Sequence, residues 1–305
     1  MREVPCHTVD QELISSALAD VRSRADGHWR ELYYYVSLDL LQQMSDDLLD
    51  HVAAHSQQDP VLSSFVAREA LDTAAECTLG VLGIGAYPKG DFEIPLPIVN
   101  DALLSENYDC PPGAALAPTA RTWQDAFALC LASGRIWDRE RAIGLLLRDD
   151  YAPAIREGVP YSLRKSLSDP ADLVSMDALC GYLTEARGHL PSDWPTVPLR
   201  MPTAGERAEA ARRLDALGGL SPDQRLLRVL LEDDPEAFEA ALVERLVQYR
   251  ESQPADAAPR SLLPLGTIAL VALAVHVHGW VPNIRSGYLP QALLQAPPGA
   301  PRAHG

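Results

Sequence analysis

Apolar residues recur every three to four positions along most of the chain, and this spacing predicts helices. An amphipathic run from Leu13 to Val21 follows a capping-box pattern at residues 8–11. Later helix starts are predicted by capping boxes at Thr203–Glu206 and Ser221–Gln224, and by the caps Asp169 and Asp234, each followed by a proline at the first helical position. The helices predicted in this way cover residues 13–21, 29–55 with a break near Ser45, 60–80, 122–134, 138–148, 170–187, 204–217, 222–232, 235–251 and 262–275.

No segment alternates convincingly between apolar and polar residues with period two. The pattern therefore predicts an all-α multi-helix bundle of stacked helix hairpins. Residues 141–150 resemble residues 225–234, because both segments are amphipathic and end in an acidic pair. This internal similarity suggests a solenoid-like stacking of the hairpins.

Residues 86–121 interrupt the helical pattern with six prolines, and we expect an irregular crossing there. The stretch FEIPLPIV within it is compatible with a short extended segment at a sheet edge. We expect one all-α domain over residues 1–294 and a disordered tail over 295–305. The alternative is two lobes, 1–85 and 122–294, joined by the proline-rich segment.

The most apolar stretch, residues 262–275, raises the question of a membrane helix. It has 14 residues and contains Pro264, Gly266 and Thr267, whereas a membrane span needs roughly 20 apolar residues. It is therefore expected to be a buried core helix. The N-terminus lacks the layout of a signal peptide, and five widely spaced cysteines without a CxxC pair indicate reduced thiols. These features predict a cytoplasmic protein with no membrane association.

Acidic residues outnumber basic ones by 42 to 26, which gives a net charge of −16. Nucleic-acid binding depends on neutralising phosphates with Lys and Arg, so this charge argues against a nucleic-acid partner. It favours a basic protein partner instead, whose approach it would accelerate.

The sequence contains no nucleophile-elbow, dinucleotide or catalytic-cysteine motif, and neither an enzymatic activity nor a cofactor is predicted. One metal-type pattern exists. Asp47, His51 and His55 share a helix face, and the two histidines have a spacing that can chelate zinc or iron. A working site would need a further ligand, and His is also favoured near helix C-termini. No metal is expected. A metal-dependent enzyme built around Asp47, His51 and His55 is kept as an alternative function.

Several stretches resemble the immunity protein 49 family of bacterial polymorphic toxin systems. They are TWQDAFALCLASG (122–134), RAIGLLLRDDYAPAIREGVPYS (141–162), ALAVHVHGW (272–280) and IRSGYLPQALL (284–294). The resemblance covers roughly residues 8 to 294. It implies an all-α cytoplasmic protein that binds a cognate toxin domain and protects the producing cell, without indicating which toxin.

An acidic helical protein without catalytic motifs suits a stoichiometric inhibitor that occludes a basic, nuclease-type enzyme. The residues predicted to contact the toxin lie at two acidic helix ends and include two aromatic anchors: Asp149, Asp150, Glu232, Asp233 and Asp234, with Trp123 and Tyr151. Capping and core packing remain the alternative roles for each of them. A non-catalytic helical scaffold or regulatory binding protein is the main alternative for function, because a helical fold does not determine function.

Overall fold

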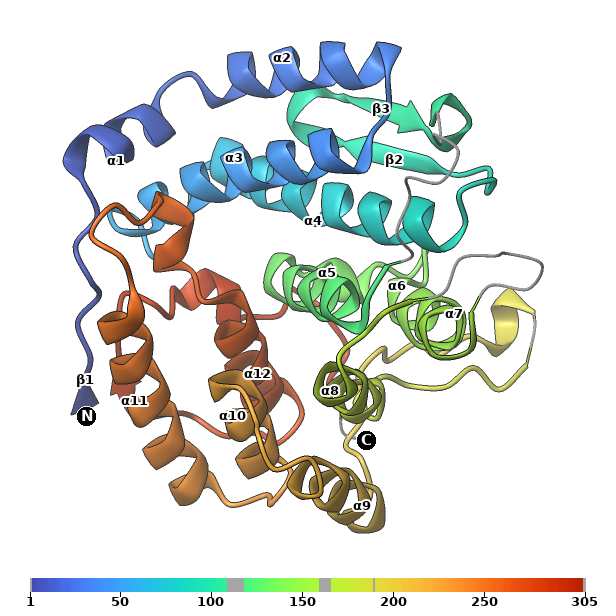
Figure 1. Ribbon diagram of the computed structural model, residues 1–305, viewed down its shortest axis with the longest axis vertical. Coiled ribbons are helices and arrows are strands. Elements are labelled where there is room, and N and C mark those ends of the chain that lie inside the picture. Colours follow the sequence, from blue (N-terminus) through green and yellow to red (C-terminus); the bar gives the residue numbers. More distant parts are fainter. Residues whose placement is uncertain (1, 109–117, 159–165, 189, 304–305) are drawn as a thin grey trace.

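The computed structural model describes residues 2–108, 118–158, 166–188 and 190–303, and helices dominate it (Figure 1). The prediction of an all-α fold is confirmed. The helices are α1 (Gln11–Leu18), α2 (Val21–Tyr34), α3 (Leu38–Ser56), α4 (Phe65–Ala86), α5 (Ala120–Ser133), α6 (Ile143–Leu145), α7 (Ala152–Glu157), α8 (Pro170–Cys180), α9 (Ala204–Asp215), α10 (Pro222–Leu230), α11 (Pro235–Ser252) and α12 (Leu265–His276).

The helices stack in layers around α5. Helices α3 and α4 pack against each other, α2 lies alongside α3, and α4 also packs on α5 (Figure 1). On its other side, α5 contacts α8 and α12, and α10 packs between α11 and α12. Helix α5 is buried along most of its length because apolar residues occupy nearly all of its last eight positions, so it faces neighbours on several sides.

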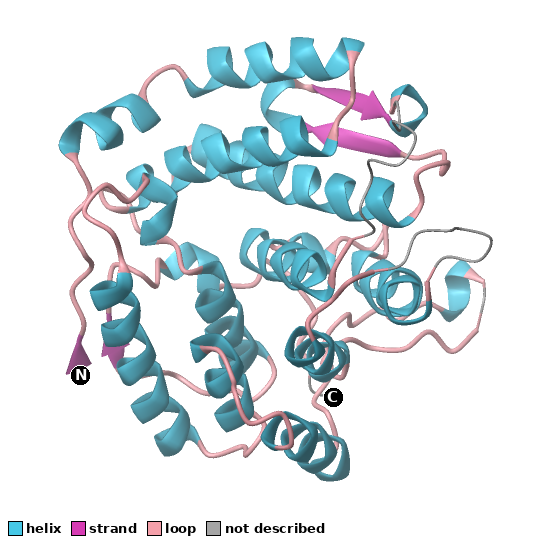
Figure 2. Cartoon of the chain, in the orientation of Figure 1, coloured by secondary structure: helices cyan, strands magenta, loops and turns pink. Residues whose placement is uncertain are grey.

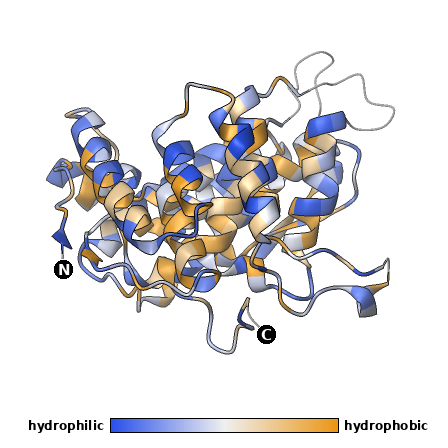
Figure 3. Ribbon diagram, turned by 90° about the horizontal axis from the view of Figure 1, so that it is seen from below, coloured by the Kyte–Doolittle hydropathy of each residue, from blue (hydrophilic) through white to orange (hydrophobic). Residues whose placement is uncertain are grey.

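Buried side chains form two clusters that meet at α5 and α12. One cluster includes Phe127 of α5 and Leu273 of α12, and the other includes Leu129 and Ile268 of the same two helices. Apolar residues are concentrated inside the helix layers and polar residues lie outside (Figure 3). The boundaries 1–294 and 295–305 stay a prediction. The tail has no helix or strand over residues 295–303, and Pro297 packs against Gly134.

Helix α12 contains most of the apolar stretch at residues 262–275, for which a membrane helix and a buried core helix were the alternatives. Residues 267–274 are all buried, as predicted for a core helix. The described residues contain one helical stretch long and apolar enough to cross a membrane, Pro259–His276, and 67% of it is buried inside the protein. Burial against α5 and α10 accounts for its apolar composition without a lipid environment.

Three predicted helices in the N-terminal part have the wrong boundaries. The helix predicted at 13–21 is α1, which ends at Leu18 and has Asp10 as its N-cap in place of the predicted capping box. The break in the 29–55 segment lies between Tyr34 and Leu38, not at Ser45, which is buried inside α3. The helix predicted from residue 60 begins only at Phe65, with Ser64 as its N-cap. Asp59 instead accepts hydrogen bonds from the backbone N–H groups of residues 61 and 63, so it closes a turn.

Two predictions in the middle of the chain also need correction. The helix expected at 138–148 begins at Ile143 and continues as a π-helix, η4 (Leu146–Tyr151). Helix α8 ends at Cys180 and does not reach residue 187, because Leu183 pairs with Leu199 in an isolated β-bridge. Residues 225–230, by contrast, lie in the regular helix α10. The two similar segments therefore have different local structures, which weakens the case for a repeat.

The proline-rich segment contains the larger of the two small sheets formed by the described residues (Figure 2). Strand β2 (Glu93–Leu96) pairs with β3 (Asp101–Leu104) in an antiparallel hairpin. The stretch FEIPLPIV thus contributes an extended segment, as expected. The other sheet joins β1 (Arg2–Glu3) to β4 (Ile284–Arg285) and fixes the N-terminal arm beside the C-terminal part of the chain.

Candidate partner-binding surface

The first predicted acidic end lies on a π-helical turn. Asp149 and Asp150 are exposed at the end of η4, where the chain continues into α7. The carbonyl of Leu147 accepts hydrogen bonds both from Ala152 N–H, five residues further on, and from the Trp123 indole, at 2.7 Å. Pro153 has no N–H to donate to the Asp149 carbonyl. The hydrogen bonds to the Leu147 carbonyl and the missing N–H of Pro153 both favour a π-helical turn, which is wider than an α-helical one. Such turns are frequent at functional sites.

Among the described residues, little neutralising charge lies near the two carboxylates on this turn. Arg148 Nε lies 3.6 Å from Asp149, but the same guanidinium also binds Glu185 and the carbonyls of Cys180 and Leu183. Among the described residues, no ion pair includes Asp150. Burial raises the pKa of both carboxyls, and the charge of Asp149 raises the pKa of Asp150 further. Such a pair gains from a cation supplied by a partner.

Two tyrosines lie beside this acidic end. The hydroxyl of Tyr87 donates to the backbone carbonyl of Asp150 at 3.1 Å, and the rings of Tyr87 and Tyr151 lie 6.1 Å apart. Burial raises the pKa of Tyr151 to about 12. Tyr151 is half-buried and keeps part of its ring at the surface, so carboxylates and aromatic rings occur together there.

The second predicted acidic end connects α10 to α11, and its side chains already have partners. Asp233 has a left-handed backbone (φ 61°) and binds Arg207 at 3.0 Å and His278 Nδ1 at 2.7 Å. Asp234 accepts hydrogen bonds from two backbone N–H groups as the N-cap of α11. Glu232 pairs with Arg228 at 2.8 Å. These three residues stabilise the chain locally, although all three remain exposed.

An open cleft of about 580 Å³ lies beside the first acidic end. Asp149 lines the cleft on one side, and Leu231, next to Glu232, lines it on another. Of the predicted contact residues, all of which the structure describes, Asp149 alone lines this cleft, and the second acidic end adjoins it through Leu231 and through Arg207, the partner of Asp233. Five arginines line this cleft, and each of them binds a carboxylate: Arg148 with Glu185, Arg156 and Arg213 with Asp177, Arg200 with Glu206, and Arg207 with Asp233.

Trp123, the other predicted anchor, lies in the core. Its side chain is 0% exposed and stacks on Phe127 with ring centroids 5.3 Å apart. This conformation leaves no part of the indole ring for a partner to contact. The hydrogen bond to Leu147 nevertheless links Trp123 to the turn that carries Asp149 and Asp150.

The histidine pattern on α3 belongs to the packing of the N-terminal helices. Asp47 binds Arg24 Nε through both carboxylate oxygens, at 3.0 Å. The His51 ring is buried and its Nδ1 donates to the Ala17 carbonyl at 3.0 Å, while the His55 ring lies 6.0 Å from the His51 ring. Within the described part of the chain, no group of three or more His, Cys, Asp or Glu side chains is placed to hold a metal ion.

The burial of His51 predicts a pH dependence of stability. Burial lowers the pKa of this imidazole from 6.5, so the unfolded chain binds a proton more readily than the folded one, and stability falls as the pH drops below 6.5. We expect urea denaturation to give a lower unfolding free energy at about pH 5.5 than at about pH 7.5. The decrease should be smaller in His51→Asn, and an equal decrease in both proteins would contradict this assignment.

One exposed group was not selected from the sequence. Tyr33, Tyr34 and Tyr35 form a run of three aromatic residues at the end of α2, and all three are exposed. The sequence signal was present, because consecutive helical residues point about 100° apart and cannot all face one core. The apolar spacing over residues 29–55 predicts these tyrosines as part of a helix and does not single them out.

The chain belongs to the immunity protein 49 family. A sequence model of this family, described as Immunity protein 49, matches residues 59–293 of the 305-residue chain. The predicted resemblance is thereby confirmed, although the match begins after α3. Comparisons with curated proteins and with solved structures gave no match. Membership implies an immunity protein of a toxin system, with a cognate toxin as its partner.

Proposed function

We propose that this protein binds its cognate toxin domain stoichiometrically in the cytoplasm of a bacterial cell and blocks the toxin's active site by occlusion. Family membership is the observation that carries this proposal. Occlusion requires no chemistry from the immunity protein, which agrees with the absence of catalytic motifs in its sequence.

The toxin is proposed to be a basic, nuclease-type enzyme of a polymorphic toxin system. A net charge of −16 favours a basic partner, because complementary charge speeds encounter and disfavours wrong partners. Nucleases need positive clefts to hold phosphates, and such a cleft would meet the incompletely neutralised carboxylates Asp149 and Asp150. Tyr151 supplies an aromatic ring next to them, and Glu232 follows Leu231, which lines the same cleft as Asp149.

A rescue assay tests this function. The toxin domain encoded nearest to the gene for this chain would be induced in a sensitive host, with and without this protein, and survivors counted. Survival together with a co-purifying complex is the expected result. If the well-folded protein neither rescues nor co-purifies with the toxin, the helical scaffold function becomes the better one.

Charge reversal then locates the contact. We expect Asp149→Lys/Asp150→Lys to weaken toxin binding by roughly 100-fold or more, since close interfacial charge pairs contribute several kcal/mol. The matched control is Glu251→Lys/Asp256→Lys, which changes the net charge equally at two exposed positions near the end of α11. Equal affinity of both double variants, measured by calorimetry, would remove Asp149 and Asp150 from the interface.

The second acidic end is better tested with a single substitution, because two of its residues stabilise the fold. Glu232→Lys is the suitable variant, since Asp233 holds Arg207 and His278 and Asp234 caps α11. Arg228, which would lose Glu232, keeps Asp215 at 2.8 Å. Loss of affinity in Glu232→Lys would therefore report on contact with the toxin and not on unfolding.

A further inference from the structure

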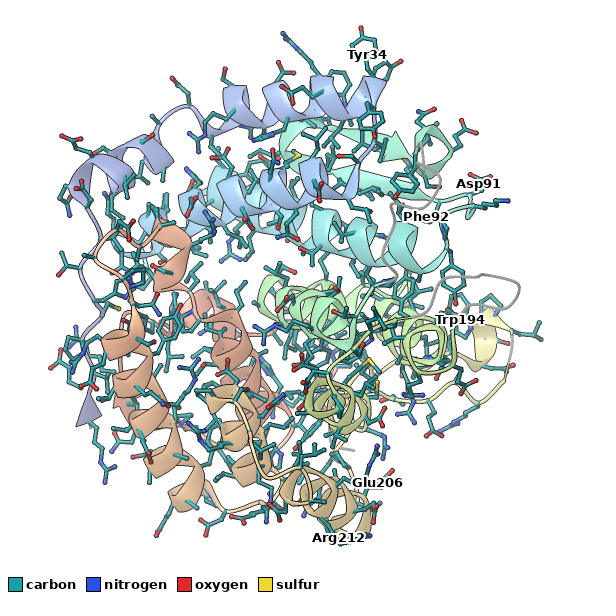
Figure 4. The ribbon with its side chains drawn as sticks, viewed as in Figure 1. Tyr34, Asp91, Phe92, Trp194, Glu206 and Arg212 are labelled. Carbon is teal, nitrogen blue, oxygen red and sulfur yellow. The ribbon has the colours of Figure 1, made fainter. Side chains whose placement is uncertain are left out.

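The exposed end of α2 carries an aromatic surface, which we define as the tyrosine edge: Tyr33, Tyr34 and Tyr35. Their exposed fractions are 55%, 86% and 44%, unusual values for aromatic side chains. Figure 4 shows Tyr34 at the outer end of α2, directed away from the protein. The rings of Tyr33 and Tyr34 lie 5.5 Å apart in an edge-to-face arrangement, and Trp29 packs against Tyr33 at 5.5 Å.

The fold itself makes little use of these rings. Helix α2 buries Val21, Ala25 and Leu32, which attach it to the rest of the N-terminal part. Tyr33 and Tyr34 follow this buried face, and their ring contacts are with each other and, for Tyr33, with Trp29. More than half of each of these two side chains is exposed, so most of their apolar surface is open to a partner.

Carboxylates are concentrated on the hairpin beside the end of α2. Val36 pairs with Tyr108 in an isolated β-bridge, which holds the end of α2 beside the β2–β3 hairpin. On this hairpin and its flanking turns, Asp91, Glu93, Asp101 and Glu106 are exposed, and so is Leu104. Lys89 is the single basic residue from 87 to 108. Figure 4 shows Asp91 on the same side of the protein as Tyr34.

We propose that the tyrosine edge and the adjacent acidic hairpin form a second docking surface, which binds the basic face of the cognate toxin. This inference rests on the proposed function. Tyrosine rings flanked by carboxylates suit Arg and Lys side chains, which gain both cation–π contact and ion pairing there. A second copy of this chain is a poor occupant, because each copy carries a charge of −16 and would present the same acidic edge.

The surface also provides a means of selecting the toxin. The family match covers residues 59–293, so the tyrosine edge lies in the part of the chain outside the matched region. Asp149 and Asp150, in contrast, lie inside it. A surface of this kind can distinguish toxins that share a basic cleft, because specificity is a difference between affinities.

Calorimetry with the neighbouring toxin domain, inactivated and purified, tests the inference. We expect Tyr33→Ala/Tyr34→Ala to bind about 30-fold more weakly, as removal of aromatic hot-spot residues does. The control Leu167→Ala/Val281→Ala removes two apolar side chains that are 80% and 90% exposed elsewhere, and it should bind like the unchanged protein. Tyr34→Ala alone removes a side chain with almost no packing, so its affinity remains interpretable if the double variant is unstable.

The other outcomes separate the two proposals. If the unchanged protein binds the toxin and the tyrosine variants bind equally well, the docking surface is wrong and the proposed function stands. If the unchanged protein does not bind, the proposed function fails and the inference fails with it. Sedimentation of the protein alone gives a further outcome: a dimer that Tyr34→Ala dissociates would assign the tyrosine edge to self-association and overturn the inference.

Discussion

Replacing Arg141 by Leu should lower the free energy of unfolding by about 3–5 kcal/mol, because it leaves a buried carboxylate without its main partner. Glu76 is 0% exposed in the middle of α4, and its Oε1 binds the guanidinium of Arg141. The remaining cation near this oxygen is Arg135, whose Nε lies 3.5 Å away and is not aligned for a hydrogen bond. Urea denaturation measures the loss directly.

Two variants make this prediction specific. Arg139→Leu removes an exposed arginine two positions away and should change stability little. The double variant Glu76→Leu/Arg141→Leu removes the buried charge together with its partner, so it should be more stable than Arg141→Leu alone. A loss below about 1 kcal/mol in Arg141→Leu would show that Arg135 suffices to compensate Glu76.

The ion pair between Glu76 and Arg141 also affects the candidate interface, because the chain after Arg141 leads to that interface. Arg141 precedes Ala142, whose left-handed backbone (φ 48°) turns the chain into α6 and η4. The side chain of Glu76 thus fixes the approach to the turn that carries Asp149 and Asp150. A loss of toxin binding in Arg141→Leu must therefore be separated from a loss of folding before it is assigned to contact.

The helix starts that sequence reasoning located best are those determined by adjacent residues. The capping boxes at Thr203–Glu206 and Ser221–Gln224 are present, and Asp169 and Asp234 cap α8 and α11 as predicted. In each case the cap bonds backbone groups two or three residues away. Hydrogen bonds between residues this close in the chain can be predicted from the sequence alone.

Two of the wrong helix predictions depend on residues far apart in the chain. The π-helical turn η4 arises where Trp123 donates to the Leu147 carbonyl across 24 positions. The apolar spacing around residues 138–148 gives no sign of that bond, so it predicted an ordinary helix. The same holds for the break after Tyr34, where the pairing of Val36 with Tyr108 replaces helical hydrogen bonds.

The candidate site was only partly predictable for a related reason. Acidic pairs at helix ends are visible in the sequence, but their neutralisation is not, because their partners come from distant elements. Asp233 meets Arg207 of α9 and His278 after α12, whereas Asp150 has no ion pair among the described residues. Two segments that look alike in the sequence therefore differ in what they offer a partner.

The second large effect is expected for Trp123→Ala, which should lower the free energy of unfolding by about 3–5 kcal/mol. The variant removes a fully buried ring and its stack on Phe127, and it removes one of the two donors to the Leu147 carbonyl. Chemical denaturation measures the loss. Trp123→Phe keeps most of the apolar volume and should lose less, mainly the hydrogen bond worth about 1 kcal/mol.

These variants also decide whether Trp123 contacts the toxin. If its role is in the core, Trp123→Ala reduces protection by lowering the folded population, and Trp123→Phe, whose fold is nearly intact, binds the toxin almost normally. A contact role gives the opposite result, in which Trp123→Phe keeps its stability but loses affinity. The burial of this ring leads us to expect the first result, with Trp123 acting on the interface through the position of Leu147 and the turn behind it.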